Sequence, residues 1–297
     1  MLKISPYAKK CVNNSILITG SARSGTTITG QILSSMEGVE FCYEPPMLLT
    51  LFNLVNTIPE EEWKLLFETY LFEEFMMNAL AGRNFNFNHV DNSSILKIKS
   101  LEEIESRLNL NLPKIDAEML SVRKKLACKL PDIMEMIPKV KTLYPKMHVV
   151  VTVRDAIGTL NSVLERGWFG EKGSKASLIW PFREYGAIRV PYWVRSTDSA
   201  YWTGLSELDK AAYYYIVMSE GIEKIADRIQ ISYRELIATP YAKVEKIADT
   251  LGLKMSPKTS EIISSIKPTY RDRNLKILDE INSDLRKKVK IYSESFE

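Results

Sequence analysis

The chain has 297 residues, 45% of them hydrophobic, which is enough to bury a substantial core in one domain. Its 40 basic and 37 acidic side chains nearly cancel, and the net charge of +3 argues against a nucleic-acid-binding coat or a charged membrane-binding surface. Any anion site must therefore be built locally.

The cysteines and the start of the chain bear on the cellular compartment. Cys11, Cys42 and Cys128 are widely separated and lack the spacing of a disulfide framework or a zinc site. Neither a signal peptide nor an uninterrupted run of about 18 apolar residues is found, and no repeat or linker divides the sequence. We therefore expect a single soluble, cytoplasmic domain over residues 1–297, without a membrane span, a bound metal or a nucleic-acid partner.

The first predicted elements are a strand, a loop and a helix. Residues 15–19 are apolar and β-branched and precede a Gly/Ser loop, which is typical of a buried strand. From residue 26 the apolar positions share one helical face until Gly38, so a helix is expected there. Residues 60–81 carry aromatic and leucine side chains at three- and four-residue spacing, which predicts a long amphipathic helix.

The middle of the chain gives three weaker patterns and a strong one. Residues 94–99 alternate like an edge strand, whereas residues 116–128 and 131–143 are typical of helices. Residues 148–153 include four valines and give the clearest signal of a buried strand. A helix should follow from Asp155, a natural N-cap, to about residue 166.

The last third of the chain continues this alternation. Residues 206–227 predict an apolar, tyrosine-rich helix, and residues 229–233 predict a strand. Residues 239–252 predict a helix that begins at Thr-Pro and ends at a glycine. Strands alternating with helices indicate a P-loop-type α/β fold, with a parallel sheet flanked by helices on both faces and a site at the carboxyl ends of the strands.

The loop after the first strand carries the motif Gly20-Ser-Ala-Arg-Ser-Gly-Thr-Thr27. In this setting backbone N–H groups and a helix N-terminus can cradle a phosphate. A nucleotide triphosphatase would continue Gly-Lys-Ser/Thr, to reach the β/γ-phosphates and to hold magnesium. Here Thr-Thr follows Gly25, and the cation Arg23 lies inside the loop, which suits a donor with one 5′-phosphate and one transferable group. A turn without a ligand is the alternative.

This loop resembles the 5′-phosphosulfate-binding loop of the sulfotransferases that use 3′-phosphoadenosine 5′-phosphosulfate (PAPS), whose Golgi and bacterial members read Pro-Arg-Ser-Gly-Thr-Thr. Ala22 replaces the usual proline. The resemblance implies a sulfotransferase that needs no metal and releases adenosine 3′,5′-bisphosphate. It also implies that the 5′-phosphosulfate is held by Arg23, Ser24, Gly25, Thr26 and Thr27.

A second motif is Val149-Val-Val-Thr-Val-Arg154-Asp155, with Ser162 eight residues after the arginine. Arg154 ends the buried strand and Ser162 lies about two turns into the next helix, so both can converge on one phosphate. The pair resembles the family's 3′-phosphate site, and it disfavours a kinase because ATP has no 3′-phosphate. An isolated arginine at a strand end is more often a surface ion-pair residue. Asp155 is better interpreted as a helix cap than as an acid catalyst.

Two further segments resemble the family less closely. Tyr233 ends the strand over residues 229–233 and is expected to contact the adenine, although a tyrosine there is as often a core anchor. Near the C-terminus, Lys267, Arg271 and Arg273 occupy the region of the family's basic loop over the 3′-phosphate. A basic stretch is otherwise a solvated surface.

Sulfuryl transfer needs a base for the acceptor hydroxyl and cations for the charge that develops on the leaving oxygen. Glu44, in Tyr-Glu-Pro-Pro, resembles the glutamate that acts as base in carbohydrate and tyrosylprotein sulfotransferases; a turn glutamate is the alternative. His89 and His148 are weaker choices, because neither stands where the cytosolic sulfotransferases place their histidine.

The expected catalytic cations are a lysine and the loop arginine. Lys99 matches the family's lysine on the strand that faces the sulfonate, and by that resemblance it would stabilise the leaving phosphate oxygens together with Arg23. Lys97 takes this role if the register is shifted by one strand repeat.

The acceptor is expected to bind residues 168–205, which hold four of the five tryptophans and three arginines without a clear period. Long irregular segments often carry function, so this one predicts an acceptor-binding insertion or lid; a loop pinned by its aromatic rings is the alternative. A glycan is the favoured hydroxyl acceptor, on the resemblance around Glu44, followed by protein tyrosine or a small phenol or alcohol. A P-loop kinase and a non-catalytic nucleotide-binding module are the alternative functions.

Overall fold

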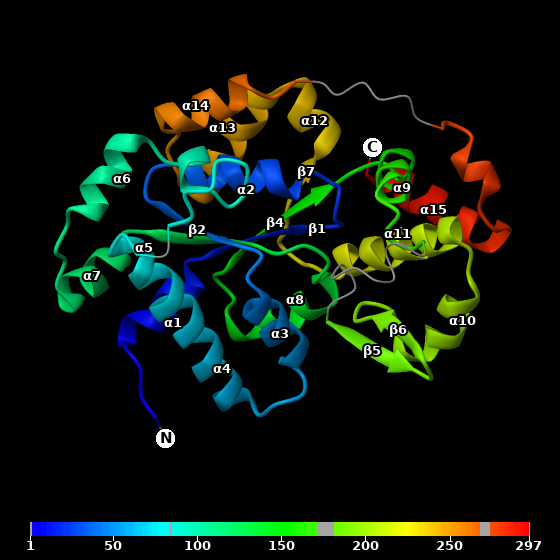
Figure 1. Ribbon diagram of the computed structural model, residues 1–297, viewed down its shortest axis with the longest axis horizontal. Coiled ribbons are helices and arrows are strands. Elements are labelled where there is room, and N and C mark those ends of the chain that lie inside the picture. The colour runs from blue at the N-terminus through cyan, green and yellow to red at the C-terminus, as the bar shows by residue number, and fades with distance from the viewer. Residues whose placement is uncertain (1, 84, 171–180, 268–273, 297) are drawn as a thin grey trace.

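The computed structural model describes residues 2–83, 85–170, 181–267 and 274–296, which form an α/β fold around a five-stranded sheet (Figure 1). The strand order is β2-β3-β1-β4-β7, and the pairings are parallel. The strands of this sheet are β1 (Ile16–Gly20), β2 (Val39–Tyr43), β3 (Lys125–Lys129), β4 (His148–Val153) and β7 (Ile229–Ser232).

Helices cover both faces of the sheet, because central parallel strands bury side chains on both sides (Figure 1). Ile16 and Ile18 point to one face and Leu17 to the other. The first face packs against α2 (Thr26–Ser35), α13 (Pro240–Leu251) and α14 (Pro257–Ser264). The second face packs against α1 (Pro6–Asn13), α3 (Pro46–Leu54), α4 (Glu60–Thr69), α8 (Ile137–Leu143), α9 (Ala156–Glu165), α11 (Glu207–Glu223) and α15 (Ser283–Ser295). The predicted fold class is confirmed.

The elements with clear caps or long apolar runs are confirmed: β1, β4, β7, α2, α9, α11 and α13. Asp155 caps α9, and its Oδ1 accepts a hydrogen bond from the Gly158 N–H at 2.6 Å. The Ser206 side chain caps α11 in the same way. Gly252 ends α13 with φ of 62°, a left-handed conformation that favours glycine.

Two predictions in the middle of the chain are wrong. Residues 94–99 form no strand, and contain only the 3₁₀ turn η2 (Ile95–Lys97). Residues 116–128 are not one helix, but are divided between α7 (Lys114–Ser121) and β3. The apolar run of β3 is short, and its strand conformation is fixed by pairing with β2 on one side and β1 on the other. Tertiary pairing therefore overrides the local pattern.

The predicted helix over residues 60–81 is helical but changes pitch along its length. After α4 it continues as the π-helix η1 (Tyr70–Met77) and as α5 (Asn78–Leu80). Its aromatic face is core, since the rings of Trp63 and Phe67 stack with centroids 4.4 Å apart. The predicted helix over residues 131–143 begins later than expected, with η3 (Met134–Met136) and then α8.

The described part of residues 168–205 is more regular than its sequence pattern. It forms an antiparallel hairpin of β5 (Phe182–Tyr185) and β6 (Ile188–Pro191). The turn η6 (Ser196–Asp198) and the helix α10 (Ser199–Gly204) follow it. The remaining elements are α6 (Leu101–Leu108), α12 (Tyr233–Ala238) and η7 (Ile277–Glu280). In the described ranges, every helix is too short or too polar to cross a bilayer.

Candidate active site

The loop between β1 and α2 has a backbone that two glycines make possible. Gly20 has φ of 142°, and a Cβ there would lie 2.3 Å from the carbonyl oxygen of Thr152 on β4. Gly25 is the N-cap of α2 with φ of 98°, and a Cβ there would lie 2.5 Å from the ring of Tyr233. An anion in this loop would meet backbone N–H groups and the positive end of the helix dipole.

The two motifs predicted to bind anions are in direct contact. Arg23 Nε donates a hydrogen bond to Ser162 Oγ on α9 at 3.0 Å. Arg154 Nη1, directly after β4, donates to the Arg23 carbonyl oxygen at 2.8 Å. Arg154 and Ser162 are separated from Arg23 by 131 and 139 positions in the chain. The three residues nevertheless form one cationic cluster beside the N-termini of α2 and α9.

The polar side chains of the loop have different positions. Thr26 and Thr27 line the cavity described below. The Ser24 hydroxyl instead donates to the Ser21 carbonyl oxygen at 2.6 Å and lies 2.7 Å from Thr152 Oγ1. Ser24 is fully buried, so its side chain fixes the shape of the loop.

Tyr233 lies at the start of α12, where its ring covers Gly25. The Arg154 guanidinium lies 4.9 Å from the centroid of the same ring, in a cation–π contact. Tyr233 therefore orients Arg154 and closes one side of the loop. Its predicted contact with adenine stays a prediction.

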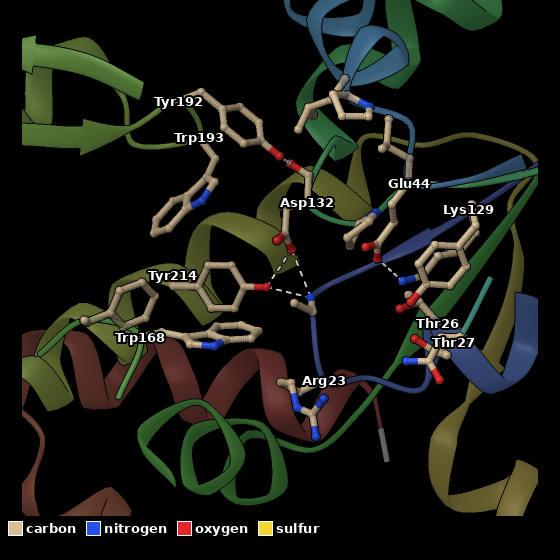
Figure 2. A pocket seen from close by; sticks show the side chains of 18 residues that line it. Arg23, Thr26, Thr27, Glu44, Lys129, Asp132, Trp168, Tyr192, Trp193 and Tyr214 are labelled. Atoms are coloured by element: carbon tan, nitrogen blue, oxygen red, sulfur yellow. Dashed lines mark hydrogen bonds and ion pairs between the residues drawn. The ribbon is translucent and has the colours of Figure 1, made fainter. Parts of the chain in front are cut away.

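A cavity of about 480 Å³ opens at the carboxyl ends of the strands, beside this loop (Figure 2). Its charged lining residues are Arg23, Glu44, Lys129 and Asp132. One wall is aromatic and comes from the segment after α9 and from α11, with Trp168, Phe169, Tyr192, Trp193 and Tyr214. The cavity thus combines cations, carboxylates and flat apolar surfaces, as a binding site for an organic ligand requires.

Glu44 and Lys129 form an ion pair in this cavity (Figure 2). Glu44 directly follows β2, and its N–H donates to the Lys129 carbonyl oxygen at 2.9 Å. Lys129 is the last residue of the neighbouring strand β3, and its Nζ lies 4.7 Å from the centroid of the Tyr43 ring. Pairing of β2 with β3 therefore brings the carboxylate and the ammonium together.

Lys99 does not lie in this cavity, contrary to the sequence-based expectation. It is buried, and its Nζ donates to the carbonyl oxygen of Val39 at 2.7 Å. Val39 is the first residue of β2, so Lys99 lies at the amino end of the sheet, opposite to the loop. The expectation depended on a strand over residues 94–99, which does not form; the lysine that ends a strand beside Glu44 is Lys129.

The other candidates for base or cation also lie outside the cavity lining. His148 begins β4, at the amino end of the sheet, and burial lowers its pKa. His89 is exposed in the segment before η2. Lys97 is partly exposed, and its Nζ donates to the Val90 carbonyl oxygen at 3.2 Å.

Asp132 is a cavity residue that the sequence analysis missed. Its Oδ1 accepts hydrogen bonds from the Tyr214 hydroxyl at 2.5 Å and from the Ala22 N–H of the loop at 2.9 Å. Burial raises the pKa of Asp132 to about 6, and the nearby Glu44 charge adds to the increase. Lys129 and Asp132 both belong to Lys-Leu-Pro-Asp after the apolar run of β3, and recognising that short strand would have identified both.

The aromatic wall is held together by ring contacts. Trp193 packs against Trp202 and Tyr214, with centroids 5.1 and 5.0 Å apart, and Phe169 contacts all three rings. This packing fixes Tyr214 beside Asp132. Trp180, also counted in the predicted acceptor segment, lies outside the described residues.

Of the three C-terminal basic residues expected over the 3′-phosphate, the structure describes only Lys267. Lys267 is exposed and is absent from the cavity lining. Arg271 and Arg273 lie outside the described residues. Across the described ranges, His, Cys, Asp and Glu side chains form no group of three that could hold a metal ion.

Unfavourable backbone conformations gather at the cavity. Four non-glycine residues in the described ranges have positive φ: Arg23 (73°), Glu44 (43°), Asp132 (63°) and Asp227 (54°). The first three line the cavity, whereas Asp227 lies in an exposed turn before β7. Such conformations cost free energy and are typical of functional sites.

The sequence and the structure were compared with known proteins. A family model described as the sulfotransferase family matches residues 15–257. No curated protein matches the sequence.

Among solved structures, a sulfotransferase from Mycobacterium avium is 10% identical, with a TM-score of 0.50, and the alignment covers 98% of this chain and 79% of that one. A sulfotransferase domain from the Synechococcus olefin synthase is 12% identical, with a TM-score of 0.47 and coverage of 95% and 94%. A sulfotransferase from Alicyclobacillus acidocaldarius is 11% identical, with a TM-score of 0.46 and coverage of 95% of both chains. At these identities the likeness concerns the fold alone.

Proposed function

This chain belongs to the sulfotransferase family, and we propose that it transfers the sulfuryl group of PAPS to a hydroxyl of a carbohydrate, with Glu44 as the base. As a member of this family it is an enzyme that uses PAPS as donor. The observation that carries the proposal is the convergence of Arg23, Arg154 and Ser162 beside a cavity that also holds Glu44 and Lys129.

Donor binding is assigned to the two connected motifs. Arg23, Thr26, Thr27 and the N–H groups around Gly25 would hold the 5′-phosphosulfate at the N-terminus of α2. Arg154 and Ser162 would hold the 3′-phosphate, since a guanidinium and a hydroxyl are good phosphate ligands. Their contacts to Arg23 support this assignment, because they connect both phosphate positions through one residue: Ser162 bonds its side chain and Arg154 its carbonyl oxygen.

Transfer then follows from the residues that line the cavity. Glu44 takes the proton of the acceptor hydroxyl as its oxygen forms a bond to sulfur. The bond between sulfur and the bridging oxygen of the donor breaks, and the electron pair stays on the 5′-phosphate. Lys129 and Arg23 stabilise the negative charge that develops on that oxygen. The products are the sulfated acceptor and adenosine 3′,5′-bisphosphate.

A carbohydrate acceptor is favoured by the wall opposite Glu44. The rings of Trp168, Trp193 and Tyr214 offer flat apolar surfaces of the kind that pack on the apolar face of a sugar. We assign the described part of residues 168–205 to acceptor binding for the same reason. The three cysteines are free and buried, which supports a reducing compartment, and we propose the cytoplasm.

Thermal unfolding with nucleotides tests the donor, and labelled PAPS tests the transfer. Adenosine 3′,5′-bisphosphate at about 100 times its Kd should stabilise the protein by about 2.7 kcal/mol and raise its Tm. Label should then move from PAPS to neutral sugars. Stabilisation by ATP with magnesium, and none by the bisphosphate, would contradict the proposal.

A further inference from the structure

The cavity holds a second carboxylate that the proposed transfer does not use. Glu44 is paired with Lys129, whereas Asp132 lies between Tyr214 and the loop (Figure 2). The hydrogen bonds that this carboxyl accepts from Tyr214 and from the Ala22 N–H both end on Oδ1. No described residue donates a hydrogen bond to Oδ2. Oδ1 is therefore hydrogen-bonded within the protein, and Oδ2 can accept a hydrogen bond from a ligand.

Asp132 and Glu44 face the same space. Both line the cavity, and the Glu44 charge is one of the groups that act on the Asp132 carboxyl. Figure 2 shows the two carboxylates between Lys129 on one side and the rings of Trp168 and Tyr214 on the other. An acceptor on the aromatic wall would thus meet two carboxylates at once.

The charges of the cavity favour an uncharged acceptor. Among the residues that the structure describes, its charged lining consists of two cations, Arg23 and Lys129, and two carboxylates, Glu44 and Asp132. The proposed transfer uses both cations for the donor. An anionic acceptor would then face two carboxylates with no further cation in the described part of the lining, and like charges at short range are unfavourable.

We propose that Asp132 Oδ2 accepts a hydrogen bond from a second hydroxyl of the acceptor, next to the hydroxyl that Glu44 activates. The preferred acceptor is then an uncharged ring with two neighbouring hydroxyl groups, as in a neutral sugar. This inference rests on the proposed function. A hydroxyl is a good donor to a carboxylate, and an acceptor that lacks it would cover this charged oxygen without giving it a partner. Sites built for a substrate hydroxyl therefore discriminate strongly against analogues without it.

The test compares trans-1,2-cyclohexanediol with cyclohexanol, which has the same ring and one hydroxyl fewer. Label transferred from PAPS gives kcat/KM for each probe. In the wild-type protein we expect the diol to be preferred by at least about tenfold, the value of one charged hydrogen bond. Asp132→Asn keeps an acceptor for Ala22 and Tyr214 but removes the charge, so the preference should fall towards one, mainly through the KM of the diol.

A matched control is Asp227→Asn. Asp227 is also an aspartate with positive φ, but it is exposed and lies outside the cavity lining. This variant should keep the wild-type preference for the diol. Its Tm, and the shift caused by adenosine 3′,5′-bisphosphate, should be compared with those of Asp132→Asn to confirm that both variants are folded and bind the donor product.

The possible outcomes separate this inference from the proposed function. Equal kcat/KM for the diol and cyclohexanol in the wild type would overturn the inference, and this measurement needs no variant. A preference that survives Asp132→Asn would overturn it too, as would transfer to 4-nitrophenol with none to either ring alcohol. A wild-type protein that does not bind the bisphosphate, or transfers label neither to these probes nor to neutral sugars, would instead contradict the proposed function itself.

Discussion

The two ends of strand β2 carry an acidic residue each, and the protein uses them differently. At the amino end, Glu40 accepts two hydrogen bonds from Arg107 at 2.6 and 2.9 Å, and Lys99 bonds the nearby Val39 carbonyl oxygen. At the carboxyl end, Glu44 pairs with Lys129 in a cavity that is also lined by the loop Gly20 to Thr27.

Burial alone does not separate these two ends. Lys99 is 3% exposed and Lys129 is 2% exposed, yet only Lys129 lines the cavity. The two ends differ in whether their charged groups can bind a further partner. Arg107 and Glu40 satisfy each other in a bidentate pair, whereas Lys129 stands where an anionic donor could become a second partner. Charges committed within the fold stabilise it, and charges that face a cavity are available for chemistry.

The largest expected difference between the two ends concerns the acids. Glu44→Gln removes the proposed base and should lower kcat by about 10²–10⁴, with bisphosphate binding kept. Glu40→Gln should instead lower the free energy of unfolding, by up to about 3–5 kcal/mol, because buried Arg107 loses its buried carboxylate and keeps only the more exposed Glu103 as an ion-pair partner. Labelled-PAPS transfer and urea unfolding measure the two effects. If both variants lost kcat equally, per folded molecule, the two acids would not differ in function and the comparison would be wrong.

The lysines give the next largest contrast. Lys129→Ala removes a cation from the leaving oxygen and should lower kcat by about 10²–10³. Lys99→Ala should leave kcat unchanged and cost about 1–3 kcal/mol of stability, because the Val39 carbonyl loses its donor. The two variants remove the same group, so each is the control for the other. A larger loss of kcat in Lys99→Ala would restore the assignment expected from the sequence.

Arg154→Ala tests the donor side of the carboxyl end. The lost charged hydrogen bond to the 3′-phosphate should weaken adenosine 3′,5′-bisphosphate by about 1.5–3 kcal/mol, measured by calorimetric titration. Adenosine 5′-phosphosulfate lacks that phosphate and should bind the variant and the wild type almost equally. An equal loss for both ligands would mean that Arg154 acts through the shape of the loop, since it also bonds the Arg23 carbonyl oxygen.

The smallest expected effect is a pH dependence at the carboxyl end. The Asp132 pKa of about 6 means that its carboxylate predominates above pH 6 and is protonated below it. The KM of a diol acceptor should therefore rise several-fold between pH 7 and pH 5. Among the described residues, the groups that face Asp132 are Tyr214, Tyr192, the Ala22 N–H, Glu44 and Lys129. Glu44 and Lys129 also face this carboxyl, so Asp132→Asn serves as the control. If the KM of the diol still rises at low pH in this variant, the rise is caused by another titrating group.

The same shift carries a stability prediction of known sign. In the folded protein the pKa of Asp132 is raised from 3.8, its value in an unfolded chain, so folding disfavours the charged form. Its contribution to stability is therefore largest below pH 4 and is lost as the pH rises to about 6. Asp132→Asn should raise the Tm at pH 7 and change it less at pH 4. A Tm at pH 7 below that of the wild type would contradict this sign.

Sequence reasoning was most successful where a site residue and its structural setting are neighbours in the chain. The loop Gly20 to Thr27 lies between a clear strand and a clear helix, and Arg154 and Ser162 flank a well-capped helix start. Their mutual contact could be anticipated because parallel strands β1 and β4 end at the same edge. The fold class followed from the same alternation of strands and helices.

The lysine and Asp132 could not be found in this way. Their strand has an apolar interior of only three residues, Leu126 to Cys128, between two lysines, and its conformation depends on strands more than 80 residues away. The alternation at residues 94–99 was the clearer local pattern, although it forms a 3₁₀ turn. Local patterns identify elements that stabilise themselves, whereas β3 is defined by its neighbours.

The positive φ angles of Arg23, Glu44 and Asp132 have a consequence for directed evolution. Glycine and asparagine adopt such conformations at lower cost than other residues, so either would relieve strain at these positions. A library selected for heat resistance alone should accumulate them at residues 23, 44 and 132. A library selected for turnover should keep the arginine and both acids. Sequencing the two populations would show at which positions this enzyme loses stability in order to keep its activity.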